Sequence, residues 1–309
     1  MAGLLKATRA LKANSSAGFD NVTPRQFRAA LLQTDLGTGL IEDLKTGRYR
    51  PGPLRRVCIP KPNGTQREIY IPSVQDRVVQ KLIVNAITPL VEARSSQHSY
   101  GFRPHRNVQQ AVRHVSQLVK AGYRVCLLVD LKNFFGNIKR ERLRALLRNY
   151  PIDPALRELV NAFIKAKAID MVDASASHGI PAGMPLAPTL ANIYLTPLDN
   201  DLAKRGVKFV RYADDITLLF RSEHECRSLY MDVSDGWEER FGLRINHQKT
   251  EIVSQGHRSV LGFKIGDYGG VTASTLVTDV LAESLTDLLS AANVPLGILQ
   301  KQIKVEVHC

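Results

Sequence analysis

The chain of 309 residues contains few cysteines, no paired metal-ligand cysteine spacing and no long apolar run. Scattered cysteines of this kind are typical of reduced, structural thiols rather than of a cysteine-held metal. They are Cys58, Cys126, Cys226 and Cys309. No apolar stretch reaches transmembrane length, and the first residues lack the apolar segment of a signal peptide. These absences predict a cytoplasmic protein with no membrane partner.

Acidic residues are also scarce relative to basic ones, because 29 Asp and Glu face 42 Lys and Arg and leave a net charge of +13. Such an excess favours a polyanionic partner, with nucleic acid as the leading candidate and a generally basic surface without a specific ligand as the alternative. Internal repeats, low-complexity tracts and interdomain linkers are absent from the sequence. The length suits one catalytic unit of two or three subdomains.

Two adjacent carboxylates, Asp214 and Asp215, lie between apolar runs at 207–210 and 216–220. These runs have the β-branched and aromatic bias of strands, which places the two aspartates at or near a connecting turn. Neighbouring carboxylates repel each other and resist loss of water, so this context predicts a bound cation.

A third carboxylate, Asp130, follows the short apolar run 125–129, which has the pattern of a buried strand. Three aspartates at strand ends can hold two magnesium ions, which would clamp the attacking and leaving oxygens of a phosphoryl transfer. The sequence therefore predicts a metal-dependent phosphoryl-transfer site.

The remaining pattern alternates helices with short strands and turns. Helices are predicted over 75–94, 189–198 and 226–241. The segment 4–46 is also predicted to be helical, with a break at 14–21 and a new start at Thr23-Pro24. Between 139 and 167 two helices are predicted, separated by a break at Pro151 and Pro154. A hairpin is predicted from strands at 56–59 and 67–71. Glycines and prolines between 179 and 188 predict a loop, and Trp237 is expected in the core.

Six short segments occur in an order that carries a resemblance. They are RVCIPKPNG at 56–64, QDRVVQ at 75–80, SYGFRP at 99–104, DLKNFF at 130–135, LANIYL at 190–195 and YADD at 212–215. The ordered set resembles reverse transcriptases, and the chain is similar to the group II intron type over nearly its whole length. The resemblance implies an α+β right-hand polymerase with fingers at 1–100 and 140–178, a palm with an antiparallel sheet at 101–139 and 179–265, and a short helical thumb at 266–309.

The resemblance also assigns roles to the predicted metal site. Asp130 and Asp214 would bridge two Mg²⁺ ions, Asp215 would support the site, and the Leu131 carbonyl would contribute a ligand. Mn²⁺ is the expected substitute for Mg²⁺.

Several further residues are expected to contact the incoming nucleotide. Lys61 and Arg67 resemble residues that grip the triphosphate, and their alternative is a solvated basic hairpin. Phe135 matches the aromatic residue that excludes a 2′-hydroxyl, although it could simply be a core residue beside Phe134. Lys249 matches a lysine near the leaving pyrophosphate, with a surface lysine as its alternative.

Other positions complete the expected site or depart from the family. Ala182 and Gly183 lie in the loop expected beside the nucleotide, and Ala182 stands where the family usually has glutamine. Ala187 and Gly136 likewise replace the usual serine and aspartate, which puts processivity, fidelity and nucleotide choice in doubt. Arg77 and Arg103, from two of the matching segments, are predicted to contact nucleic acid.

The expected function is RNA-directed DNA synthesis from deoxynucleotides on an RNA template with a DNA primer or product. The alternatives are a catalytically silent RNA-binding scaffold, which the three aspartates argue against, and an RNA-directed RNA polymerase, which Phe135 argues against. For the biological role we favour antiphage defence, with CRISPR-associated and group II intron-derived enzymes as alternatives. The segment 259–265 resembles the closing hairpin of the family, and only 44 residues follow it. We therefore expect a dedicated structured RNA, an accessory protein or self-association to complete the enzyme.

Overall fold

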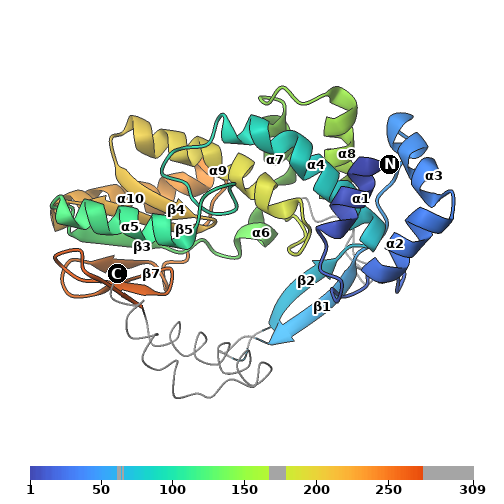
Figure 1. The fold of residues 1–309 in the computed structure, drawn as a ribbon. Coiled ribbons are helices and arrows are strands. Elements are labelled where there is room, and N and C mark those ends of the chain that lie inside the picture. Colours follow the sequence, from blue (N-terminus) through green and yellow to red (C-terminus); the bar gives the residue numbers. More distant parts are fainter. Residues whose placement is uncertain (61–63, 65, 167–178, 274–309) are drawn as a thin grey trace, which may run out of the picture.

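The structure is a computed structural model that describes residues 1–60, 64, 66–166 and 179–273 (Figure 1). Its helices and antiparallel sheets form a helical lobe, from which a β-hairpin projects, and a lobe built on a sheet. The long helices α4 (Val74–Glu92) and α9 (Ala187–Lys204) pack against each other and connect the two lobes. Sequence and structure therefore agree on an α+β fold.

The helical lobe begins with three short amphipathic helices, α1 (Ala2–Arg9), α2 (Pro24–Gln33) and α3 (Leu36–Lys45). Helix α2 starts at the predicted Thr23-Pro24 step, where Thr23 and Gln26 form a capping box and Pro24 occupies the first turn. Helices α1 and α2 both pack against α4. Their buried apolar faces make this lobe continuous with the main core.

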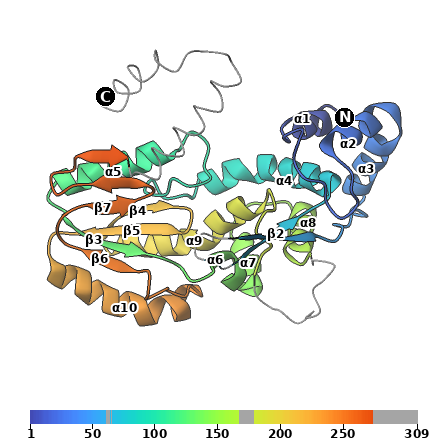
Figure 2. The same cartoon turned by 90° about the horizontal axis from the view of Figure 1, so that it is seen from below.

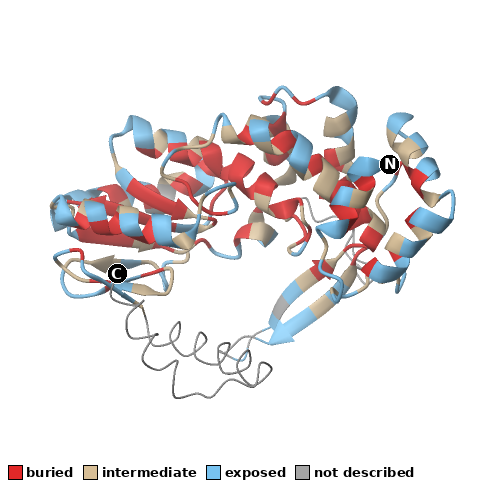
Figure 3. Cartoon of the chain, in the orientation of Figure 1, coloured by how far each residue is buried: buried red, intermediate tan, exposed pale blue. Residues whose placement is uncertain are grey.

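The predicted hairpin is formed by β1 (Arg55–Pro60) and β2 (Gln66–Ile71), which pair in antiparallel register. It projects away from the helical lobe (Figure 1). Exposed residues predominate toward its tip, whereas its base lies beside the buried Leu54 and Tyr70 (Figure 3).

The central sheet has four antiparallel strands in the order β4-β5-β3-β6. Their bounds are Val125–Val129 for β3, Lys208–Tyr212 for β4, Asp215–Phe220 for β5 and Glu251–Val253 for β6. Alternate residues of each strand point to opposite faces, and both faces of β3, β4 and β5 are covered, which explains why these strands are apolar almost throughout.

Helix α5 (Val108–Lys120) covers one face of this sheet, and α10 (Glu223–Phe241) covers the other together with α9 (Figure 2). On the α10 side Trp237 is fully buried, as predicted. On the α5 side Cys126, Val210 and Leu219 pack against the apolar stripe of α5. The short helices α6 (Phe134–Asn137), α7 (Arg140–Leu147) and α8 (Pro154–Ile164) follow β3.

A second, three-stranded sheet packs near α5. It consists of β7 (Arg258–Val260), β8 (Phe263–Ile265) and β9 (Val271–Ala273). The Ser116 hydroxyl on α5 donates a hydrogen bond to the Gly269 carbonyl at 2.6 Å and ties this sheet to the helix. Because 271–273 form β9, the segment expected to be a thumb from 266 onward begins by extending this sheet. The rest of the expected helical thumb, from 274 to 309, lies outside the described residues.

None of the helices in the described ranges combines the length and the hydropathy needed to cross a membrane.

Candidate active site

The β4–β5 turn carries two of the predicted catalytic carboxylates. Tyr212 pairs with Asp215 at the end of the ladder, so Ala213 and Asp214 form a two-residue turn. Ala213 has a left-handed backbone with a φ of 57°, which is rare for an alanine. The predicted strand-turn-strand setting of the paired aspartates is therefore confirmed.

Asp130 lies beside this turn because β3 runs antiparallel to β5. Val129 pairs with Ile216, so the residue after β3 and the first residue of β5, Asp130 and Asp215, fall side by side at one end of the sheet. Strand alternation also puts both on the face that α5 covers. The topology thus brings together carboxylates that are 85 positions apart in the sequence.

Asn246 holds Asp130 in place and was missed by the sequence analysis. Its side-chain amide donates to Asp130 Oδ2 at 2.8 Å, and its backbone N–H donates to the Asp130 carbonyl at 2.8 Å. The Asp130 N–H in turn faces the Thr250 hydroxyl at 3.3 Å. Asn246 lies three residues before the predicted Lys249, and a lone asparagine gives no sequence signal for this role.

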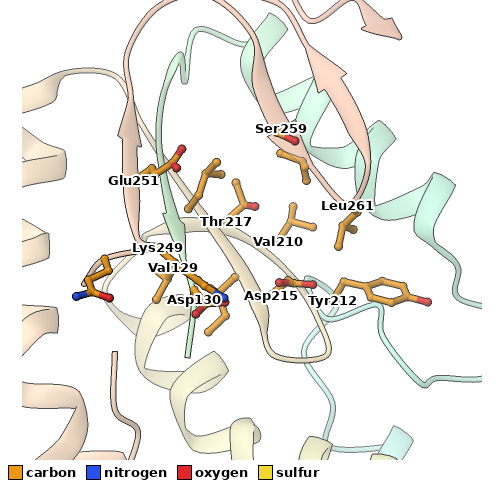
Figure 4. Close-up of a pocket in the computed structure, with 14 residues that line it drawn as sticks. Val129, Asp130, Val210, Tyr212, Asp215, Thr217, Lys249, Glu251, Ser259 and Leu261 are labelled. Carbon is orange, nitrogen blue, oxygen red and sulfur yellow. The ribbon is translucent and has the colours of Figure 1, made fainter. Parts of the chain in front are cut away.

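A cavity of about 530 Å³ opens between this end of the central sheet and the β7–β8 hairpin (Figure 4). Its lining includes Asp130 and Asp215, together with Lys249 and Tyr212. Asp214, in the turn, is outside that lining. The exposed Lys249 lines the same cavity as Asp130, so one predicted cation faces the space that the predicted carboxylates line.

The carboxylates at this site oppose one another electrostatically. Part of Asp215 is exposed to solvent, but the surrounding polypeptide still removes some of the water around its carboxylate. This loss of water, and after it the negative charges of Asp214 and Asp130, raises the pKa of Asp215 to about 6. A divalent cation would relieve this repulsion, and carboxylate oxygens are the ligands that Mg²⁺ prefers. The donor set therefore fits the predicted ions.

The arrangement is not yet that of an ion-holding cluster. Within the described ranges, no three His, Cys, Asp or Glu side chains are gathered so that they could hold a metal ion as they stand. The bridge that joins Leu131 to Ile245 is made by bonds from Lys132 N and Asn246 N, neither of which uses the predicted ligand, the Leu131 carbonyl.

Of the residues expected to contact the nucleotide, Phe135, Ala182 and Gly183 are outside the lining of the cavity. Phe135 is half-buried in α6 with its ring 5.2 Å from that of Phe134, so it partly fills the core role that was its alternative. The Ala182 carbonyl accepts a bond from Tyr70 N at 2.8 Å. Gly183 has a φ of 104°, and a side chain there would meet Ile69 and Tyr70. This loop is therefore fastened to the β1–β2 hairpin.

The four remaining residues were predicted to contact nucleotide or nucleic acid, and for none of them does the structure show a side chain that is free to do so among the described residues. Lys61 is outside the described residues, and the backbone of Arg67 pairs with Ile59 in the hairpin. The side chain of Arg103 is only 7% exposed, forms a bidentate ion pair with Glu92 and donates to two backbone carbonyls. Arg77 is buried too and donates to Ser15 and Ser16.

Both arginines are thus engaged within the fold. Their geometry does not support the predicted nucleic-acid contacts, because each guanidinium is committed to protein oxygens. A basic residue in a matching motif cannot be assigned to solvent or to the interior from sequence alone.

Comparison with known proteins agrees with this geometry. Residues 59–265 match the family described as reverse transcriptase (RNA-dependent DNA polymerase). The chain belongs to the reverse transcriptase family. It is therefore by family an RNA-directed DNA polymerase, which is a nucleotidyltransferase.

This reverse transcriptase has relatives of several kinds. It is 29% identical to Protein YkfC of Escherichia coli over 94% of this chain and 87% of that protein. It is 31% identical to the group II intron-encoded protein LtrA of Lactococcus lactis over 72% of this chain but only 35% of LtrA. It is 23% identical to the retron Mx162 reverse transcriptase of Myxococcus xanthus over 81% of this chain and 51% of that protein.

Solved structures support the right-hand polymerase fold. The telomerase of Candida albicans, solved with a fragment of telomeric RNA, superposes with a TM-score of 0.59 at 14% identity. The match covers 74% of this chain and 48% of the telomerase chain. At this identity the likeness concerns the fold alone.

Proposed function

We propose that this reverse transcriptase adds deoxynucleotides to a DNA 3′ end on an RNA template by a two-metal mechanism. The observation that carries the proposal is the meeting of Asp130 with the Asp214-Asp215 turn at one end of the central sheet, beside an open cavity. Reverse transcriptases generally depend on divalent metal ions. We assign the ions to Asp130 and Asp214, with Asp215 and the Leu131 carbonyl in support and Mn²⁺ as the substitute for Mg²⁺.

In the proposed reaction the primer 3′-hydroxyl gives up its proton to water, its oxygen bonds to the α-phosphorus of the nucleotide, and the bond from that phosphorus to pyrophosphate breaks. When bound, the two ions supply positive charge that favours the attacking and leaving oxygens. Lys249, at the edge of the cavity, would donate a proton to the departing pyrophosphate. Phe135 would exclude a 2′-hydroxyl, while Lys61 and Arg67 would neutralise the triphosphate.

The test is primer extension on an RNA template with and without Mg²⁺. Replacing Asp214 and Asp215 by alanine should abolish incorporation while the fold stays intact, because the change removes ion ligands and relieves repulsion. Asp232→Asn is the matched control, since it removes a carboxylate that pairs with Arg205 and Arg240 on the α10 side. Extension by the double variant at the parental rate would refute the assignment.

A catalytically silent RNA-binding scaffold is the second candidate. It is favoured by one observation, that no ready-made ion cluster is found among the described carboxylates. A scaffold predicts RNA binding without Mg²⁺-dependent incorporation from the parental protein. The same assay therefore separates the two functions.

For the biological role we propose antiphage defence with a dedicated structured RNA as template. The excess of 42 basic over 29 acidic residues supports a polyanionic partner, and the altered loop at Ala182 supports a specialised template. Sequencing the RNA and DNA that copurify with the protein tests this role. A unique structured RNA with its complementary DNA would support it, whereas intron RNA or CRISPR-array transcripts would point to the other roles.

A further inference from the structure

A buried ion pair lies directly behind the catalytic turn. Arg211, on β4, donates from Nε and Nη2 to the two carboxylate oxygens of Asp199, on α9, at 2.7 and 2.6 Å. Each side chain is only 1% exposed. Burying two charges costs several kcal/mol per ion, so a pair of this kind adds little stability in itself. Its presence calls for another reason.

The third nitrogen of Arg211 reaches the turn itself. Nη1 donates to the Ala213 carbonyl at 2.9 Å and to Asn192 Oδ1 at 3.1 Å. The Ala213 carbonyl belongs to the peptide that leads into Asp214, so this bond fixes the orientation of that peptide. The left-handed backbone of Ala213 costs about 1 kcal/mol and persists only where surrounding contacts impose it.

The segment before α5 also holds the turn. The Tyr100 N–H donates to the Arg211 carbonyl at 2.8 Å, and Asn192 Nδ2 donates to the Gly101 carbonyl at 3.0 Å. A Cβ atom on Gly101 would lie 2.2 Å from the Ala213 nitrogen, so the two backbones are in the closest contact that glycine permits. Asn192 therefore links Arg211 to the segment that closes over Ala213.

We propose that Asp199, Arg211 and Asn192 form a positioning network that keeps Ala213 left-handed and thereby directs the ion-binding carboxylates of the turn. The inference rests on the proposed function only in that these carboxylates bind ions for catalysis. Arginine is required at 211 because its planar fork serves two Asp199 oxygens and the turn at once. A lysine amine is a single point charge that cannot span the same acceptors.

The test compares Arg211→Lys with Arg258→Lys. Arg258 is equally buried and paired with Asp267, but it donates to Arg124 and Gly256 rather than to the turn. Mn²⁺ binding by electron paramagnetic resonance is measured on each purified protein without nucleic acid, and the Mg²⁺ concentration for half-maximal incorporation is measured separately. Circular dichroism confirms that each variant is folded.

Arg211→Lys should weaken Mn²⁺ binding about 10-fold, the usual loss when the groups that orient metal ligands are removed. Arg258→Lys should leave Mn²⁺ binding unchanged. Adding Ala213→Gly to Arg211→Lys should restore part of the affinity, because glycine adopts the left-handed backbone without being forced. If Arg211→Lys does not fold, Asn192→Ala, which keeps the ion pair, should give a smaller loss in the same direction.

Parental Mn²⁺ affinity in a folded Arg211→Lys or Asn192→Ala protein would overturn the proposal. A loss that Ala213→Gly does not relieve, or an equal loss in Arg258→Lys, would overturn it as well. If the parental protein binds Mn²⁺ in the way described but incorporates no nucleotide, the positioning network stands and the proposed function fails.

Discussion

The catalytic turn and the β1–β2 hairpin each join two antiparallel strands, but the surrounding fold encloses the turn much more tightly than the hairpin. The turn is fixed by the side chain of Arg211 on β4 and by the close approach of Gly101, and the side chains behind it, Arg211, Asp199 and Asn192, are buried. The hairpin projects from the helical lobe, is mostly exposed toward its tip, and is fastened near its base by the bond from Tyr70 N to the Ala182 carbonyl (Figures 1 and 3).

This difference fits the roles that we propose for the two regions. Ligands of metal ions need a fixed geometry, because an ångström of error at reacting atoms costs orders of magnitude in rate. Residues that capture a nucleotide benefit from a part of the fold with few buried contacts, which can move at low cost. Variants in the turn should therefore change the chemical step, and variants in the hairpin should change nucleotide binding.

Asp130→Asn tests the turn side of the comparison and has the largest expected effect. The amide keeps its shape and can still accept the bond from Asn246, but it loses the charge that an ion requires. Incorporation at saturating nucleotide should fall about 10³-fold, which corresponds to roughly 4 kcal/mol of barrier. Thermal unfolding should show an intact fold, and a kcat within a few-fold of the parental value would contradict the assignment.

A pair of glycine substitutions sharpens the contrast in rigidity. Gly101→Ala introduces a methyl group that would lie 2.2 Å from the Ala213 nitrogen, and overpacking should lower the free energy of unfolding by about 2 kcal/mol. Gly64, near the hairpin tip, has a φ of 79°, and an added Cβ atom there would meet no neighbouring atom. Gly64→Ala should therefore introduce only backbone strain of about 1 kcal/mol. Urea unfolding compares them, and equal losses would mean that the turn is not tightly enclosed.

Arg67→Ala tests the hairpin side. If the hairpin captures the triphosphate, losing one cation should raise the KM for deoxynucleotides about 10-fold, as expected for a hydrogen bond to a charged group. The Mg²⁺ concentration for half-maximal incorporation should change little. Steady-state kinetics measure both quantities, and the neighbouring Gln66→Ala is the control. A fall in kcat without a change in KM would place Arg67 in the chemistry instead.

Asp215→Asn tests the repulsion at the turn and has the smallest expected effect. The pKa of Asp215 is raised from 3.8 to about 6. Between these pH values the folded state holds more protons than the unfolded state, so the free energy of unfolding falls as pH rises from about 4 to 6. The asparagine variant should remove that dependence. In chelator at pH 7 its free energy of unfolding should exceed that of the parent by about 1 kcal/mol, a small gain because water screens an exposed carboxylate.

Denaturant unfolding at pH 4 and pH 7 checks this prediction, with Mg²⁺ added in a parallel series. Parental and variant stability should converge at pH 4. A variant less stable than the parent at pH 7 without metal would mean that the carboxylates do not repel each other in the folded protein.

Local patterns were sufficient to predict the strands that carry the aspartates. The apolar run before Asp130 and the two runs around Asp214-Asp215 are bounded by polar residues, and all three form strands of the central sheet. Helix α10 was predicted for the same reason. Helix α5 was not assigned, although Asn107 caps it and the apolar residues at 111, 112, 115 and 119 follow helical spacing.

The contacts that fix the site depend on residues far apart and could not be predicted. Asp199 and Arg211 are ordinary charged residues in sequence, and only the packing of α9 on β4 buries them together. Asn246 reaches Asp130 across 116 positions. Conversely, Arg103 was predicted to contact nucleic acid, but in the fold its guanidinium is paired with Glu92. Sequence patterns report local periodicity, whereas burial of a charge is decided by tertiary contacts.

The most direct test of the central claim, that Asp130 and the turn hold the catalytic ions, is to locate those ions. Crystals of the protein with primer, RNA template, deoxynucleotide and Mn²⁺ would be measured near the manganese absorption edge. The proposed mechanism predicts two anomalous peaks, both within ligand distance of Asp130 and Asp214. Two peaks elsewhere, or none with nucleotide bound, would contradict it.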